Sequence, residues 1–203
     1  MAALPDEKTM HQALINEDKS FAGLFPPGVN NTDNSIITLA RMATPLGKMV
    51  AGALVDGICL LEFADRLMPE KQLARLGKLF QAQLLPGQSD YLNTLSRELD
   101  LYFKGRLREF KVPLIMAGSE FQERVWRALQ TIPYGQTRSY KQQAIMIGHP
   151  KAMRAVGRAN GANRIAIIIP CHRVIGENSK LIGYGGGLWR KRFLLDLEQK
   201  NLK

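Results

Sequence analysis

Three short stretches in the first half of the chain, at residues 36–42, 48–55 and 58–63, are mostly apolar and are bounded by turn residues. Short apolar runs between turn residues are typical of β-strands. The stretches are separated by a turn at residues 44–47 and by the pair Asp56 and Gly57, which favours a two-residue hairpin. The pattern therefore predicts an antiparallel meander of three strands.

Two later stretches, residues 70–84 and 90–103, have apolar residues at every third or fourth position, which places them on one face of a helix. These faces are Leu73, Leu76 and Phe80 in the first stretch and Leu92, Leu95, Leu99 and Phe103 in the second. We therefore expect residues 36–117 to form a small α/β scaffold domain with no catalytic constellation of its own. Residues 1–35 lack this periodicity and are expected to form an arm or linker.

Helical patterns dominate residues 118–203. Ser119 and Ser139 are each followed three residues later by glutamine, which is the spacing of a capping box. Pro150 suits the start of a further helix that ends near residue 160. Two short helices joined by a tight turn that contains glycine predict a helix-turn-helix. The chain is thus expected to be a two-domain α/β protein whose second domain is mostly helical.

The last helix of this motif is narrow and basic. Small residues are frequent in it, and Lys151, Arg154 and Arg158 recur along one face. A narrow basic helix suits close approach to phosphates, although small residues also suit packing against neighbouring helices. Because the helix has few side chains of the kind that read base edges, sequence-specific transcriptional binding is not the first choice.

The apolar run at residues 165–169 is rich in β-branched residues and too short for a typical helix, so it predicts a buried strand or strand-like segment. Cys171 follows it at the edge of the core, with His172 beside it. A histidine can take the proton of a thiol, and the thiolate is the form that attacks. Neighbours on an extended segment point in opposite directions, so His172 is expected to reach Cys171 only through a turn or a bridging water. The alternative is a buried cysteine beside a solvated histidine.

The net charge of +10 is placed unevenly. Residues 118–203 hold 15 of the 28 Lys and Arg residues and 5 of the 18 Asp and Glu residues, so the whole excess lies in the half that holds Cys171. This placement favours a polyanionic partner, with DNA or RNA as the leading candidate.

The two cysteines, Cys59 and Cys171, exclude a disulfide framework, and three widely spaced histidines offer no zinc site. Cys59 lies in an apolar run and is expected to be a small core residue. No apolar run approaches the roughly 18–20 residues that span a bilayer, and the start of the chain does not resemble a signal peptide. We therefore expect a cytoplasmic or nucleoid-associated protein.

A motif around Cys171 carries a family resemblance: Pro170-Cys171-His172-Arg173-Val174. With residues 151–157 and 183–184, it resembles the O6-alkylguanine-DNA alkyltransferases. The resemblance is strong over residues 118–198 and weaker over 36–117, where only the order of elements supports it. It implies a ribonuclease-H-like topology for the domain at 36–117. It also implies that the domain at 118–203 docks, as a monomer, in the minor groove of double-stranded DNA that contains alkylated guanine.

The resemblance also implies a chemistry. Cys171 would accept the alkyl group from guanine O6, and possible activity on O4-alkylthymine is left open. His172 would deprotonate Cys171 through a water, Glu198 would orient His172, and Asn163 would brace the turn around the site. One molecule would repair one lesion, and no redox partner, nucleotide cofactor or catalytic metal is implied.

Binding of the flipped base is assigned by the same resemblance. Tyr140 would crowd the backbone phosphate and contact the flipped base, and Arg154 would fill the space that the base leaves. Tyr184 and the N–H of Gly185 would meet the guanine oxygen, while the carbonyls of Cys171 and Val174 would accept from the guanine amino group. Lys151 and Arg158 would contact the DNA.

Three other functions fit part of the sequence. A non-catalytic lesion binder of the alkyltransferase-like kind would lack the reactive cysteine, so Cys171 counts against it. A transcriptional regulator could use the helix-turn-helix, but the metal-site cysteines of the bifunctional regulators are absent. A cysteine hydrolase is more distant, because adjacent Cys and His are not the usual arrangement of such enzymes.

Overall fold

The computed structural model describes residues 35–66 and 69–202. These residues form two compact units. The first comprises the described residues up to Asp100 together with Lys111–Ile115, and the second comprises Leu101–Phe110 and the residues from Met116 onward. The arm expected at residues 1–35 lies, apart from its last residue, outside the described part of the chain.

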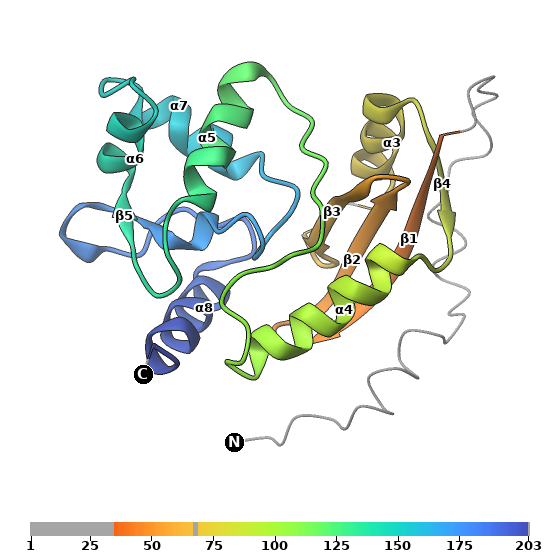
Figure 1. Ribbon diagram of the computed structural model, residues 1–203. Coiled ribbons are helices and arrows are strands. Elements are labelled where there is room, and N and C mark those ends of the chain that lie inside the picture. The colour runs from red at the N-terminus through yellow and green to blue at the C-terminus, as the bar shows by residue number, and fades with distance from the viewer. Residues whose placement is uncertain (1–34, 67–68, 203) are drawn as a thin grey trace. The chain divides into compact units, whose positions relative to one another are not determined.

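A four-stranded sheet forms the centre of the first unit, in the order β3-β2-β1-β4 (Figure 1). Its strands are β1 (Ile36–Thr44), β2 (Gly47–Leu54), β3 (Gly57–Phe63) and β4 (Gln83–Pro86). The first three pair antiparallel, which confirms the predicted meander. The fourth pairs parallel with β1, matching Ile36 to Gln83 and Ile37 to Leu84.

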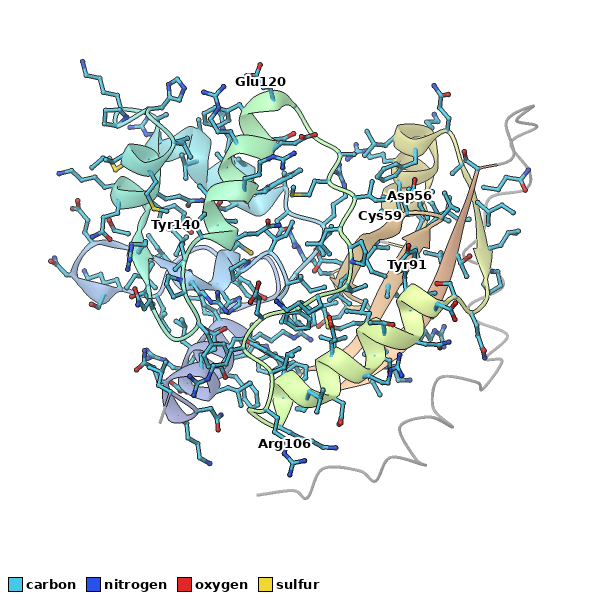
Figure 2. All side chains as sticks on the ribbon, in the orientation of Figure 1. Asp56, Cys59, Tyr91, Arg106, Glu120 and Tyr140 are labelled. Carbon is cyan, nitrogen blue, oxygen red and sulfur yellow. The ribbon has the colours of Figure 1, made fainter. Side chains whose placement is uncertain are left out.

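Two helices accompany the sheet, α3 (Pro69–Phe80) and α4 (Asp90–Phe103). The bounds of α4 are those predicted. The prediction of one helix over residues 70–84 was wrong at its end, because Gln81 adopts a left-handed φ of 48° and the chain then turns into β4. Leu73 and Leu76 of α3 pack with Leu39 and Leu60 in one buried cluster that also holds Cys59, which Figure 2 labels on the sheet.

The second unit is mostly helical, as predicted. Its elements after residue 115 are α5 (Glu120–Gln130), β5 (Arg138–Ser139), α6 (Tyr140–Met146), α7 (Met153–Gly161), the 3-10 helix η1 (Cys171–Arg173), β6 (Val174–Ile175), the 3-10 helix η2 (Glu177–Ser179) and α8 (Leu188–Lys200). Both predicted capping boxes are present, from Ser119 to Gln122 and from Ser139 to Gln142.

Helices α6 and α7 form the predicted helix-turn-helix and are fixed by buried polar contacts. Gln143 of α6 and Asn160 of α7 exchange side-chain amide hydrogen bonds of 2.7 and 3.2 Å. The indole N–H of Trp126 in α5 donates to the carbonyl of Ala159 at 2.8 Å. Helix α7 begins three residues later than predicted from Pro150, because residues 149–152 form a turn. Lys151 therefore precedes the helix that carries Arg154 and Arg158.

The strand predicted at residues 165–169 is wrong. The segment is a compact turn in which the Ile169 N–H donates to the Ile165 carbonyl at 3.0 Å and Ile167 has a φ of 71°. Its buried side chains bear out the expected burial. An apolar run reports burial, but not whether its backbone bonds to a neighbour or to itself.

In helix α8 the sequence places Trp189, Phe193, Leu194 and Leu197 on one apolar stripe, which predicts that the stripe is buried. Leu194 is buried as predicted, but Trp189 is 58% exposed and Phe193 is 39% exposed, so the prediction is wrong for the two aromatic residues. The buried side chains are instead Arg190, Lys191, Leu194, Leu195 and Glu198. The inward face of α8 is thus largely charged.

Candidate active site

Cys171 opens the 3-10 helix η1 directly after the buried turn at residues 165–169 and is half-exposed. Asn163 holds both ends of this turn. Its side-chain oxygen accepts from the Ile165 N–H, and its side-chain nitrogen donates to the Ile169 carbonyl, both at 2.9 Å. The same nitrogen lies 3.4 Å from the Cys171 Sγ, as a donor. An amide donor at this position favours the thiolate form.

His172 is fully buried and its Nε2 lies 2.8 Å from the Glu198 Oε1. Among the described residues no group bonds to its Nδ1. Burial lowers the pKa of His172, and the nearby Arg173 and Lys191 add to this, although Glu198 acts in the opposite direction. The neutral ring can therefore donate from Nε2 to Glu198 and accept a proton at Nδ1.

Glu198 is fully buried in α8 and is surrounded by donors. Its Oε1 accepts from the Tyr102 hydroxyl at 2.7 Å as well as from His172. Its Oε2 accepts from the Gly135 N–H and from the Arg173 Nε, each at 2.9 Å. Burial alone would raise the pKa of this carboxyl, but His172 and Arg173 outweigh burial and hold the pKa far below its usual range. Glu198 is thus a carboxylate at neutral pH.

Lys191 lies in α8 two turns before Glu198 and is also fully buried. Its Nζ donates to the carbonyls of Val174 and Ile182, both at 2.5 Å, and of Gly183 at 3.1 Å. Burial lowers the pKa of Lys191 to about 8, and attraction to the Cys171 sulfur partly opposes this shift. The lysine joins β6 to the loop that follows residue 181.

Tyr140, at the start of α6, contacts the same loop (Figure 2). Its hydroxyl donates to the Gly183 carbonyl at 3.2 Å. A Cβ on Gly183, whose φ is 57°, would lie only 2.6 Å from that oxygen, so the contact requires glycine. Burial raises the pKa of Tyr140, and Cys171 adds to the rise. The structure thus brings Tyr140, Lys191 and the loop together near Cys171.

Family models match most of the chain. The ribonuclease-like domain of 6-O-methylguanine DNA methyltransferase matches residues 37–116, and the DNA binding domain of the same protein matches residues 120–200. The chain belongs to the 6-O-methylguanine DNA methyltransferase family. This membership confirms the resemblance inferred from the sequence.

Curated relatives agree with this family. The methylated-DNA–protein-cysteine methyltransferase of Mycobacterium leprae is 46% identical over 164 residues, which cover 81% of this chain and 93% of that protein. The protein of the same name from Mycolicibacterium paratuberculosis is 64% identical over 104 residues, which cover 51% of this chain and 63% of that protein.

Solved structures of the family have the same fold. Mycobacterium tuberculosis O6-methylguanine methyltransferase matches with a TM-score of 0.68 and 42% identity, over 84% of this chain and 94% of that one. Mycobacterium tuberculosis OGT in complex with DNA matches with a TM-score of 0.68 and 41% identity, over 83% of this chain and 94% of that one.

The remaining residues that the sequence singled out lie in two places. Lys151, Arg154 and Arg158 are exposed on α7 and the turn before it, and none takes part in the contacts around Glu198 described above. In the loop, Tyr184 is half-buried and Gly185 is exposed. The Val174 carbonyl, expected to accept from guanine, already accepts from Lys191 and keeps one further lone pair.

The sequence did not single out Tyr102, Lys191 or the side chain of Arg173 as site residues. Arg173 stands inside the quoted motif, so that signal was available. A lysine two turns before Glu198 on one helix was a weaker signal, and nothing in the local pattern of residues 90–103 pointed to Tyr102.

Neither a metal site nor a membrane span was found in the part of the chain that the structure describes. Among the described side chains, at residues 35–66 and 73–202, no group of three or more His, Cys, Asp or Glu residues could hold a metal ion. In the described part of the chain, no helix has both the length and the apolar character needed to cross a membrane.

Proposed function

We propose that this chain repairs DNA by transferring the alkyl group of O6-alkylguanine to the sulfur of Cys171. The bond between the alkyl carbon and guanine O6 breaks as the carbon–sulfur bond forms. The thiol proton leaves before attack, and the guanine product gains one proton. A thioether has no easy leaving route, so each molecule acts once. The names of the curated relatives support both the substrate, methylated DNA, and the acceptor, a protein cysteine.

One observation carries the catalytic assignment. The buried His172 is tied through Nε2 to Glu198, while its Nδ1 has no bonding partner among the described residues. His172 is therefore suited to take the Cys171 proton at Nδ1 through a bridging water. In this role Glu198 orients the ring and stabilises the imidazolium that forms, and Asn163 stabilises the thiolate through its amide.

Alkyl transfer to Cys171 requires that the damaged guanine leaves the DNA helix. An O6-alkyl group inside a duplex is out of reach, so the base must flip out. We assign Tyr140 and Arg154 to this step, in the minor groove, and Lys151 and Arg158 to the phosphates. Within the pocket we assign contacts with guanine to Val174, Tyr184 and Gly185. The exposure of the three basic side chains supports the DNA contacts.

The domain and location assignments belong to the same proposal. We retain an arm at 1–35, a scaffold at 36–117 and a DNA-binding and transfer domain at 118–203, in a monomer located in the cytoplasm. The compact units differ from this division in two places, since Leu101–Phe110 and residues 116–117 group with the second unit.

The test is the mass of the intact protein after incubation with a duplex that contains O6-methylguanine. We expect a gain of one methyl group, with no more than one lesion repaired per molecule. Cys171→Ser should show no gain, and the matched control Cys59→Ser should behave as the wild type. Tight lesion binding without any mass gain would contradict transfer and would leave a damage-recognition protein.

A further inference from the structure

Tyr102 lies near the end of α4 and is fully buried. Its ring packs in an aromatic cluster, with ring centroids 5.5 Å from Phe103, 5.4 Å from Phe110 and 6.0 Å from Tyr134. These contacts leave the ring little freedom to turn, so the direction of its hydroxyl is fixed by packing.

The hydroxyl donates to the Oε1 of Glu198 at 2.7 Å, and this is the same oxygen that bonds to the Nε2 of His172. Arg173 grips both carboxylate oxygens from one side, with its Nη2 3.0 Å from Oε1 and its Nε 2.9 Å from Oε2. The oxygen that bonds to His172 is thus also held by two other donors, Arg173 and Tyr102.

The tyrosine remains a donor over the working pH range. Burial raises its pKa well above the usual value, and the charge of Glu198 raises it further. The phenol therefore stays protonated and does not compete with His172 as a base.

We propose that Tyr102 is a positioning residue for alkyl transfer, acting through Glu198 on His172. This inference rests on the proposed function. Without the hydroxyl, Oε1 loses one donor and the carboxylate is free to turn toward Arg173. The contact between Oε1 and Nε2 then loosens, and Nδ1 points toward Cys171 in a smaller fraction of molecules.

The proposal gives the first half of the chain a part in the chemistry. Residues 36–117 were expected to carry no catalytic constellation, yet Leu101–Phe110, which includes the end of α4, belongs to the second unit and contacts α8 and the residues after it. Besides Tyr102, Arg108 donates through Nη2 to the carbonyls of Asn201 at 2.9 Å and Leu202 at 3.2 Å, just beyond α8. The carboxylate of Glu198 is therefore held from both halves of the sequence.

The experiment compares Tyr102→Phe with the wild type in the full chain, by single-turnover transfer from a saturating O6-methylguanine duplex. The reaction amplitude reports the folded fraction, and the rate constant reports the chemistry in that fraction. We expect an unchanged amplitude, an unchanged duplex Kd, and a rate constant lower by about tenfold, the loss typical of one hydrogen bond to a charged group. The control is Tyr134→Phe. It removes a hydroxyl from the same aromatic cluster, but this hydroxyl does not bond to Glu198, so the variant should keep the wild-type rate constant.

A spectroscopic readout tests the contact separately from transfer. The proton on His172 Nε2 should resonate at low field by NMR, and its signal should shift in Tyr102→Phe but not in Tyr134→Phe. In a Glu198→Gln background, Tyr102→Phe should have no further effect on the rate constant, because the carboxylate through which it acts is gone.

Two results would overturn the inference. The first is a Tyr102→Phe rate constant equal to that of the wild type, whether or not the amplitude falls, because a smaller amplitude alone reports only a structural role. The second is an unmoved His172 signal. If the wild type itself transfers no alkyl group, the proposed function fails, while the NMR comparison still decides whether Tyr102 controls the histidine.

Discussion

The two cysteines of this chain occupy opposite surroundings. Cys59 is buried in the sheet, where its Sγ donates to the Gly52 carbonyl at 3.5 Å and burial raises its pKa to about 12. Cys171 is half-exposed at the end of a tight turn, with the Asn163 amide 3.4 Å from its sulfur and the charge of Lys191 attracted to it. The same side chain is inert in one place and suited to attack in the other, so the surroundings and not the residue decide reactivity.

The two cysteines differ in reactivity because their surroundings differ in polarity. The sheet surrounds the Cys59 sulfur with apolar side chains, and this burial raises the pKa more than a backbone hydrogen bond lowers it. The second unit instead buries charged side chains and compensates them, Glu198 with N–H and O–H donors and Lys191 with carbonyls. Buried charges are expensive unless they are paired in this way.

The largest expected effect is the ratio of thiol reactivities. A pKa of about 12 leaves Cys59 with about 10³-fold less thiolate at neutral pH than an ordinary thiol. In native protein treated with iodoacetamide, peptide mapping should find Cys171 labelled first, with Cys59 slower by about that factor or more. The ratio should vanish in denaturant. Equal labelling of both cysteines in the folded protein would remove the basis of the comparison.

The next effect concerns the compensated carboxylate. Glu198→Gln leaves His172 without an anionic partner, and we expect the rate constant of transfer to fall by about 100-fold. The change also leaves Arg173 buried without its carboxylate, which should cost about 3–5 kcal/mol of unfolding free energy. Single-turnover kinetics and denaturant unfolding measure the two losses, and wild-type kinetics in this variant would separate Glu198 from the chemistry.

The pKa of the Glu198 carboxyl determines how the stability of the fold depends on pH. Glu198 has a folded pKa below its unfolded value, so its contribution to stability is complete above the unfolded pKa and is lost as the pH falls toward the folded one. The wild type should therefore lose stability below pH about 4 more steeply than Glu198→Gln.

The buried charges also mark the limit of what the sequence could predict. The meander was predicted from short apolar runs between turn residues, and α4 from apolar side chains that repeat with the period of a helix. Strand β4 was missed because its pairing with β1 is remote in sequence. The buried face of α8 was misassigned because hydropathy counts Lys191 and Glu198 as exposed. Their partners, Val174 and Tyr102, become visible only in the folded chain.

A smaller effect is expected from Lys191. Its pKa of about 8 means that its charge is present below that pH and lost above it. Wild-type transfer should therefore decline by up to about tenfold as the pH rises from about 7 to about 10, while Lys191→Arg, whose guanidinium stays charged, should lack this decline. Profiles of the same shape for both proteins would show that the charge at this position does not matter.

The smallest effect is expected at Cys59. Cys59→Ala removes one buried atom from the sheet core and should lower the unfolding free energy by about 1 kcal/mol. The stoichiometry and rate constant of transfer should not change. Denaturant unfolding and single-turnover assays check the two expectations, and a slower transfer would show that the sheet thiol takes part in the chemistry after all.

The most direct test of the central claim is to locate the transferred carbon in wild-type protein, where both thiols are available. The protein is incubated with a duplex carrying O6-[¹³C]methylguanine, digested and mapped by mass spectrometry. The label is predicted on the peptide that contains Cys171, at no more than one per molecule, and absent from the peptide that contains Cys59. Label on any other residue, or methyl released in excess of the protein, would contradict the account.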